Sequence, residues 1–212
     1  MDIDGIKIVS FDVEGTLVTT DFSYTIWFEA IPLRYAERNG IDLDQSKVIV
    51  EEEYRKVGDQ RLEWYDVWYW FKKLDLGIPT PVMEKCRNKV HYYPEVSDVL
   101  ASVGGKYTLS IASGSPRDFL FHLLKDIEPH FARVFSSISD YKTLKTPEFY
   151  RKMCRTLGVR PEQVVHVGDN WQFDVLAPSE IGIHAFYLDR NGASKERDSL
   201  ADLAQLQALL LV

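Results

Sequence analysis

Five short runs of apolar residues, separated by longer segments, constrain the fold more than any other feature of the sequence. The runs cover residues 6–11, 107–112, 134–136, 164–167 and 185–188. They are short, rich in β-branched residues and apolar at successive positions, as strands are when helices cover both faces of a parallel sheet. Helix-like segments at 116–125, 147–157 and 174–180 accompany the later runs. This alternation predicts an α/β fold with a doubly wound parallel sheet.

Residues 18–93 break the alternation. They contain no convincing strand and several helical segments, including 61–77, which ends in a glycine suited to a C-cap. Another begins at Thr80-Pro81, where the threonine would cap the helix and the proline would occupy its first turn. Such an interval is too long for an ordinary loop. We therefore expect a small all-helical domain at 18–93, and a sheet domain made of 1–17 and 94–212.

Composition excludes several classes of partner. The 212 residues are 45% apolar and 27% charged, which is typical of a globular chain. The formal charge of −7, without a basic stripe, argues against nucleic-acid binding. No stretch approaches the ~20 apolar residues that span a membrane. Cys86 and Cys154 stand far apart without metal-type spacing, which fits a reducing compartment. We expect a cytoplasmic protein that binds neither nucleic acid nor membrane.

Aromatic side chains cluster within the helical interval. They are Trp64, Tyr65, Trp68, Tyr69, Trp70 and Phe71. The simpler interpretation is that a small helical domain needs large side chains for its core. The alternative is that some of them line a pocket or a dimer face, because they occupy too many angles of a helix to be buried on one side.

Residues capable of chemistry follow four of the five predicted strands. Listed in chain order, they are Asp12 and Glu14, then Ser113 and Gly114, then Lys145, and finally Asp169 and Asp174. Ligands of open α/β sheets bind beyond the carboxyl ends of the strands. We therefore expect these side chains to converge at one edge of the sheet.

The set favours magnesium-assisted phosphoryl transfer. Several neighbouring carboxylates cannot all stay ionised without a cation, and oxygen ligands without thiolates favour Mg²⁺, which shares itself with substrate phosphate. Lys145 offers charge to a phosphoryl oxygen, Ser113 and the amides around Gly114 would seat an anion ahead of a helix, and an aspartate can act as nucleophile. Each element alone is weak, because an aspartate after a strand often only forms a turn. Their order and placement carry the inference.

Four stretches resemble, in order, the motifs of the haloacid dehalogenase-like (HAD) hydrolase superfamily. They are "FDVEGTLV", "SIASGS", Lys145 ahead of "TPEFYRKMCRTLGVRPEQ", and "VVHVGDNWQFDV". The helical interval lies where the helical cap of this family lies. The resemblance implies a Rossmann-like core with a small cap domain, and hydrolysis through an aspartyl-phosphate.

The resemblance also implies catalytic roles. Asp12 would be the nucleophile and Glu14 the general acid and base. Lys145 would steady the nucleophile and the transition state, and would contact the phosphate.

Binding roles follow from the same resemblance. Thr16, Ser113 and Gly114 would contact the phosphate. Magnesium would be held by Asp12, by the main-chain carbonyl of Glu14 and by Asp169. Asp174 would complete the metal site through water or would hold Lys145.

The sequence departs from the family pattern at three places. Most phosphatases of the family carry aspartate where Glu14 stands, whereas the dehalogenases have no acid there, because halide leaves unprotonated while an alkoxide needs a proton. Retention of an acid therefore favours phosphate esters. Lys145 precedes Thr146-Pro147 where many members have Lys-Pro directly, which leaves Lys142 as an alternative. Phe173 stands where a polar residue often precedes the second acid.

We therefore expect a magnesium-dependent phosphatase that acts on a small phosphorylated metabolite, as a monomer or homodimer. One alternative is a 2-haloacid dehalogenase on the same scaffold. Another is a non-catalytic member that binds a partner through its aromatic cap. A phosphomutase would need an acid or base from the cap, and the sequence does not identify one. Among the histidines, we expect His166 to be packed within its strand and His91 to be structural.

Overall fold

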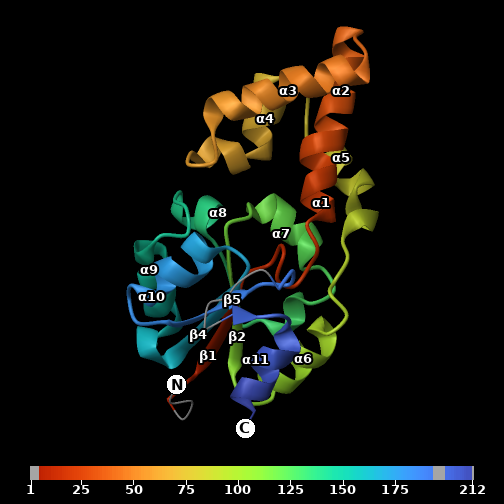
Figure 1. The fold of residues 1–212 in the computed structure, drawn as a ribbon. Helices are drawn as coiled ribbons and strands as arrows, with labels where there is room; N and C mark the ends of the chain where they lie inside the picture. Colours follow the sequence, from red (N-terminus) through yellow and green to blue (C-terminus); the bar gives the residue numbers. More distant parts are fainter. Residues whose placement is uncertain (1–4, 193–198, 212) are drawn as a thin grey trace.

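A six-stranded sheet forms the centre of the computed structural model, which describes residues 5–192 and 199–211 (Figure 1). Its strands are β1 (Ile8–Phe11), β2 (Thr108–Ser113), β3 (Arg133–Ser136), β4 (Val164–Gly168), β5 (His184–Leu188) and β6 (Ser199–Leu200). They pair in the order β3-β2-β1-β4-β5-β6, and each recorded pairing is parallel. The predicted α/β class and parallel sheet are confirmed, and β6 is an additional edge strand.

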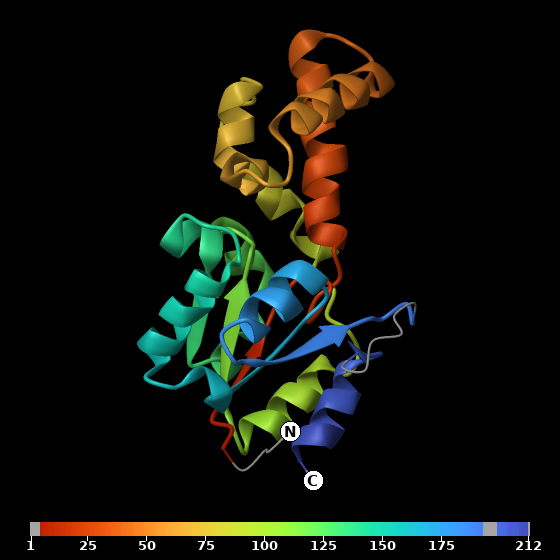
Figure 2. The same cartoon turned by 60° about the vertical axis from the view of Figure 1, so that its left-hand side comes forward.

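Helices cover both faces of the sheet, as the two views show (Figures 1 and 2). One face carries α6 (Val96–Gly104), α7 (Arg117–Leu123) and α11 (Leu203–Leu210), and the other carries α8 (Ser137–Tyr141), α9 (Pro147–Leu157) and α10 (Ala177–Ser179). Successive strand residues point to opposite faces. In β1, Val9 and Phe11 therefore pack in the first core and Ile8 packs in the second. This burial on both sides explains the continuous apolar runs.

Helix α9 begins shortly after the lysine of the predicted site. The Thr146 hydroxyl accepts a hydrogen bond from the Phe149 amide at 3.4 Å, and Pro147 occupies the first turn. Gly158 ends the helix in the left-handed region at φ 69°. Lys145 directly precedes the N-cap residue Thr146, two residues before the helix starts, so the cap helps to hold it at the carboxyl end of the sheet.

The regular elements within residues 21–89 are all helices, and these stand beyond the carboxyl ends of the strands (Figures 1 and 2). The elements are α1 (Asp21–Tyr24), the π-type η1 (Thr25–Ala30), α2 (Ile31–Asn39), α3 (Leu43–Val57), η2 (Leu62–Tyr65), α4 (Val67–Lys73), α5 (Thr80–Lys85) and η3 (Arg87–Lys89). The chain enters and leaves this helical segment side by side, through an antiparallel bridge between Val18 and Tyr92. Division into a cap of 18–93 and a core of 1–17 and 94–212 stays a prediction, and residues 1–4, 193–198 and 212 of that core lie outside the described chain.

The predicted helix at 61–77 is wrong in detail, because Asp66 divides it. The Asp66 carboxylate accepts hydrogen bonds from the amides of Trp68 and Tyr69 at 2.9 and 3.2 Å, and so starts α4 after the short η2. The aspartate side chain accepts hydrogen bonds from the main-chain amides that are unpaired at the start of a helix. Aspartate is therefore favoured at a helix N-cap and disfavoured in a helix interior. Helix α4 ends at Lys73, ahead of Gly77. Thr80 is the first residue of α5 and its side chain caps nothing.

The aromatic cluster divides between core and cavity. Trp70 and Phe71 are buried, and the Trp70 ring lies edge-on to Tyr54 with 4.6 Å between ring centroids. Trp68 is 45% exposed. Trp64 and Tyr65 line a cavity described below. Both interpretations of the cluster therefore apply, each to different residues.

Two further observations concern the whole chain. Cys86 and Cys154 are both free and buried. Within residues 5–192 and 199–211, none of the helices combines the length and apolar character needed to cross a membrane.

Candidate active site

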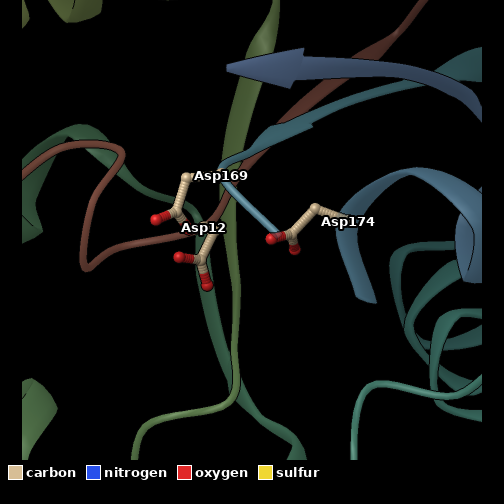
Figure 3. Close-up of side chains that lie close together, drawn as sticks. All are labelled: Asp12, Asp169 and Asp174. Carbon is tan, nitrogen blue, oxygen red and sulfur yellow. The ribbon is translucent and has the colours of Figure 1, made fainter. Parts of the chain in front are cut away.

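Three aspartates converge at the carboxyl edge of the sheet. Asp12 follows β1, Asp169 follows β4, and Asp174 lies in the π-type helix η6 (Trp171–Leu176). One carboxylate oxygen from each lies within 4.8 Å of the others. Figure 3 shows the carboxylates of Asp12 and Asp169 close together, with that of Asp174 turned towards them from its helix. Asp12 and Asp174 are buried, whereas Asp169 is exposed. The convergence expected from the strand ends is present for these three residues.

Lys145 joins two of the carboxylates. Its Nζ donates to Asp12 Oδ1 at 2.8 Å and also to Asp174 Oδ1, and the side chain is 4% exposed. Burial alone would lower the pKa of Lys145, but the two carboxylates outweigh it and raise that pKa. Lys145 is therefore a fixed positive charge beside Asp12. Lys142, the alternative, is exposed at the end of α8.

A buried polar chain holds Asp174. His166 Nε2 lies 3.1 Å from Asp174 Oδ1, and the Asn170 amide donates to Oδ2 at 3.0 Å. The Tyr150 hydroxyl lies 3.0 Å from His166 Nε2. Burial alone would raise the pKa of Asp174, but Lys145 and His166 lower it to about 2. Asp174 therefore stays ionised. His166 is packed in β4 as expected, and it also orients this carboxylate.

Two glycines allow the acids to approach the main chain. Gly15 has φ +75°, and a Cβ there would lie 2.0 Å from Asp169 Oδ2. A Cβ on Gly168 would lie 2.3 Å from the Asp174 carboxyl carbon. Neither site accepts a side chain without displacing a carboxylate. The glycines directly before Asp169 and after Glu14 are thus part of the site.

The acids are crowded enough to favour a bound cation. Burial, and then the charges of Asp174 and Asp169, raise the pKa of Asp12 to about 8, although Lys145 acts in the opposite direction. Desolvation and the charge of Asp174 raise the pKa of Asp169 to about 6. A divalent cation among these oxygens would remove the repulsion. The donor set of this group consists of three carboxylates, which fits a hard cation such as Mg²⁺.

Glu14 lies in the same cavity but outside the group of three aspartates. Its Oε2 accepts a hydrogen bond from Ser115 Oγ at 2.6 Å. Its Oε1 is buried and has no hydrogen-bond partner within the described part of the chain. Burial raises the pKa of the Glu14 carboxyl, while the hydrogen bond from Ser115 opposes that rise. One oxygen is therefore anchored, and the other is free to exchange a proton.

The residues predicted to bind phosphate occupy different positions around this group. Gly114 lines the cavity, whereas Ser113 and Thr16 are buried and are not among its lining residues. Ser113 Oγ accepts the Ser115 amide at 3.0 Å. Thr16 Oγ1 has no partner among the residues that the structure describes. Their contacts with phosphate stay predictions.

A cavity of about 410 Å³ opens between the sheet and the helical segment. The sheet side contributes Asp12, Glu14, Gly114, Ser115, Lys145, Asp169, Asn170, Phe173 and Asp174. The helical side contributes Thr20, Ser23, Trp27, Phe28, Tyr54, Trp64 and Tyr65. Its volume lies in the range of small-molecule sites.

Arg190 braces the turn that carries Glu14, and the sequence analysis missed it. Its guanidinium donates to the Gly15 and Thr16 carbonyls at 3.2 and 2.7 Å. It also pairs with Glu95 at 2.8 Å and lies over the Tyr93 ring. The strand-end rule that located the other site residues applies equally to Arg190, which follows β5 by two positions. Ser115 carried a similar signal, because it directly follows Ser113-Gly114.

Comparison with known proteins identifies the family. The model of the haloacid dehalogenase-like hydrolase family matches residues 6–182. The chain is 19% identical to GMP/IMP nucleotidase YrfG of Escherichia coli over 167 residues, which cover 78% of this chain and 75% of that protein. It is 24% identical to glyceraldehyde 3-phosphate phosphatase of Pyrococcus furiosus over 192 residues, covering 84% and 78% respectively.

Solved structures share the fold over nearly the whole chain. A HAD phosphatase from Thermococcus onnurineus superposes with a TM-score of 0.86 at 24% identity, covering 97% of this chain and 98% of that one. A 2-haloacid dehalogenase from Pseudomonas syringae superposes with a TM-score of 0.70 at 20% identity and the same coverage. These likenesses concern the fold, and both chemistries occur on it.

Proposed function

The chain belongs to the haloacid dehalogenase-like hydrolases, and from this premise we propose that it is a magnesium-dependent phosphatase of a small phosphorylated metabolite. The observation that carries the proposal is Glu14, which lines the cavity together with Asp12 and whose buried Oε1 has no partner in the described chain. Cleavage of a phosphate ester needs a proton for the leaving oxygen, whereas a departing halide does not. The printed names of the nucleotidase and phosphatase relatives also support phosphate esters.

Asp12 is the proposed nucleophile. Its carboxylate oxygen attacks phosphorus and forms an aspartyl-phosphate, while the bond from phosphorus to the leaving oxygen breaks. Lys145, at 2.8 Å from Asp12 Oδ1, favours the ionised form of this carboxylate against the effect of burial and would offset charge that gathers on the phosphoryl oxygens.

Glu14 moves the proton in both half-reactions. In the first it protonates the leaving oxygen, and its raised pKa keeps a protonated fraction available at higher pH than an exposed glutamate would. In the second it takes a proton from water, whose oxygen attacks phosphorus and releases phosphate and free Asp12. Ser115 anchors one oxygen of Glu14 through both steps.

Magnesium would be held by Asp12, Asp169 and the main-chain carbonyl of Glu14, with Asp174 acting through water or through Lys145. When bound, the ion neutralises the carboxylates and draws charge from the phosphoryl group. Thr16, Ser113 and Gly114 are the proposed phosphate contacts. We propose that residues 18–93 act as a cap that covers the leaving group and excludes water.

The decisive experiment is a screen of phosphorylated metabolites for phosphate release, with Mg²⁺ and with EDTA. The proposal predicts steady release that EDTA abolishes, and its loss in Asp12→Asn. Halide release from 2-haloacids without added Mg²⁺, together with inactivity on phosphate esters, would establish the dehalogenase instead. A tight protein partner with no turnover of either substrate class would establish the non-catalytic alternative.

A further inference from the structure

The cavity has a charged floor and an uncharged, aromatic roof. The charges of the floor come from its acids and Lys145, and the roof comes from the helical segment and from Thr20 directly before it. The roof residues are Thr20, Ser23, Trp27, Phe28, Tyr54, Trp64 and Tyr65. None of these carries an ionised group at neutral pH, because burial raises the pKa of both tyrosines. The phosphate end of a substrate would lie at the floor, so its leaving group would meet the roof.

The polar ends of the roof tyrosines are already used by the protein. The Tyr54 hydroxyl donates to the Trp27 carbonyl at 2.9 Å, and the Tyr65 hydroxyl donates to the Asp59 carbonyl at 3.1 Å. Both hydroxyls point at main chain, so these residues offer ring surface to a ligand in place of hydrogen bonds. The roof is therefore suited to contact an apolar, flat group.

The rings of the roof brace one another around Tyr54. The Tyr54 ring lies edge-on to Trp27, Phe28 and Trp64, with centroids 6.1, 6.2 and 6.0 Å apart. The Trp70 indole, buried behind them, donates to the Trp64 carbonyl at 3.1 Å. Such edge-to-face contacts hold the rings in place before a ligand arrives, which lowers the entropy lost on binding.

The cavity has no spare positive charge. Lys145 is the single cation among the described residues that line it, and both Asp12 and Asp174 already bind its ammonium group. A second phosphate or a carboxylate on the leaving group would be buried against the uncharged roof without a counterion, which is strongly unfavourable.

We propose that the leaving group carries an aromatic ring and no charge, so that the substrate is a phosphate monoester of a ring-bearing alcohol. This inference rests on the proposed phosphatase function and specifies its substrate class. A nucleoside and a phenyl-substituted alcohol share the required chemistry, and the assays below distinguish them.

The first test compares 2-phenylethyl phosphate with 2-cyclohexylethyl phosphate. The two esters share the same leaving oxygen and similar bulk and differ in the aromatic ring. Because a favourable ring pair adds about 0.5–1.5 kcal/mol beyond area burial, kcat/KM for the phenyl ester should exceed that for the cyclohexyl ester about fivefold. Equal values, with phosphate released from both, would overturn the inference and leave the phosphatase proposal intact.

The second test compares a nucleoside 5′-monophosphate with the corresponding 3′,5′-bisphosphate and with glycerol 3-phosphate. The monophosphate should be hydrolysed with at least a tenfold higher kcat/KM than either. If the leaving group is a nucleoside, stacking of the base on the roof should also make kcat/KM for the nucleoside monophosphate higher than that for 2-phenylethyl phosphate. If it is a phenyl-substituted alcohol, 2-phenylethyl phosphate should have the higher kcat/KM. Equal hydrolysis of monophosphate and bisphosphate would contradict an uncharged roof.

Variants locate the effect in the roof. Trp64→Leu should bring the phenyl-to-cyclohexyl ratio close to one. Trp68→Leu is the matched control, because Trp68 is exposed and does not line the cavity, and it should keep the wild-type ratio. If Trp64→Leu does not fold, Phe28→Leu tests the same point. Absence of phosphate release from every ester would instead refute the phosphatase proposal itself.

Discussion

Glu14 reaches the cavity from a turn that two other parts of the chain hold in place. Ser115, which follows β2, donates a hydrogen bond to Oε2 of Glu14. Arg190, which follows β5, donates to the main-chain carbonyls of Gly15 and Thr16. Oε1 is left without a partner in the described chain. An acid that is fixed at one oxygen and free at the other is suited to a defined proton-transfer distance, which requires good placement more than mobility.

Shortening this acid should therefore be costly. Glu14→Asp withdraws the carboxylate by roughly one bond length, about 1.5 Å, and a misplacement of about 1 Å can cost ~100-fold in rate. We expect kcat on an alkyl phosphate to fall about 100-fold. Hydrolysis of 4-nitrophenyl phosphate, whose leaving group needs no proton in its departure, should fall less. Equal rates for variant and wild type on the alkyl ester would show that the site is not tuned to glutamate.

His122 makes stability depend on pH where the helical segment meets the sheet domain. Its ring lies 5.4 Å from that of Phe22 and is buried on α7, with Nδ1 3.9 Å from Glu84. Burial lowers the pKa of His122 below its ordinary value, although Glu84 and Asp118 act in the opposite direction and Arg87 and Lys125 add to the lowering. The unfolded chain therefore takes up the proton first as pH falls.

The contribution of His122 to the stability of the folded protein should consequently decrease as pH drops below about 6.5, and the decrease should level off below the folded pKa. Urea unfolding at pH 7.5 and 5.5 measures this. His122→Gln, which cannot titrate, should lose less stability over that interval than wild type. An identical pH dependence in the two proteins would exclude His122 as its source.

At the scale of elements, the turn at Gly15 couples backbone geometry to the carboxylate site. This position requires glycine for two separate reasons. Its φ is +75°, and a Cβ there would lie 2.0 Å from Asp169 Oδ2. Gly58 is a control for the first reason alone, because it has φ +78° and no atom beyond its chain neighbours lies within 4 Å of the position of its Cβ. At φ 78° and ψ 155° its backbone is in a region that is nearly restricted to glycine, so Gly58→Ala should cost about 1–3 kcal/mol through backbone strain alone.

Gly15→Ala should cost backbone strain of its own, because φ is positive there, and should also displace Asp169. We expect a larger loss of stability than in Gly58→Ala, and a higher Mg²⁺ concentration for half-maximal phosphate release. Titration of activity with Mg²⁺ measures the second effect. If Gly15→Ala kept the wild-type Mg²⁺ requirement, Asp169 would not be held at the metal by this turn.

The elements also explain what the sequence could and could not predict. Strands β1, β2 and β4 are buried on both faces, so each left a continuous apolar run that was recognisable without a structure. Strand β6 is two residues long at the sheet edge and left no such run. Parallel strands end at one edge, which made the meeting of Asp12, Lys145 and Asp169 predictable.

Side chains of the helical segment were not predictable in the same way. Helical periodicity indicates which residues share a face, but not what that face contacts. Trp27 and Tyr54 therefore gave no sign that they cover the cavity. Arg190 was predictable in principle, since it follows β5 as the other site residues follow their strands.

At the scale of the whole molecule, the helical segment and the sheet share one apolar core. A single buried cluster includes Val50 and Trp70 from the helices, Val9 from β1 and Leu206 from α11. Phe22 of α1 packs edge-on against Phe119 of α7, with 5.5 Å between ring centroids. A continuous core of this kind favours cooperative unfolding.

We therefore expect one calorimetric transition, with equal calorimetric and van't Hoff enthalpies. Trp fluorescence, which reports mainly on the helical segment, should follow the same curve as far-ultraviolet circular dichroism. Two resolved transitions would show instead that the proposed cap, residues 18–93, is a thermodynamically separate domain.

The central claim is that Asp12 carries the phosphoryl group during turnover, and trapping that state tests it most directly. Glu14→Gln cannot activate water, so it should accumulate the aspartyl-phosphate when it turns over 4-nitrophenyl phosphate with Mg²⁺. After an acid quench, mass spectrometry should find a phosphoryl group on the peptide that contains Asp12, and none when Asp12→Asn is added. A burst of 4-nitrophenol with that peptide unmodified would contradict the account.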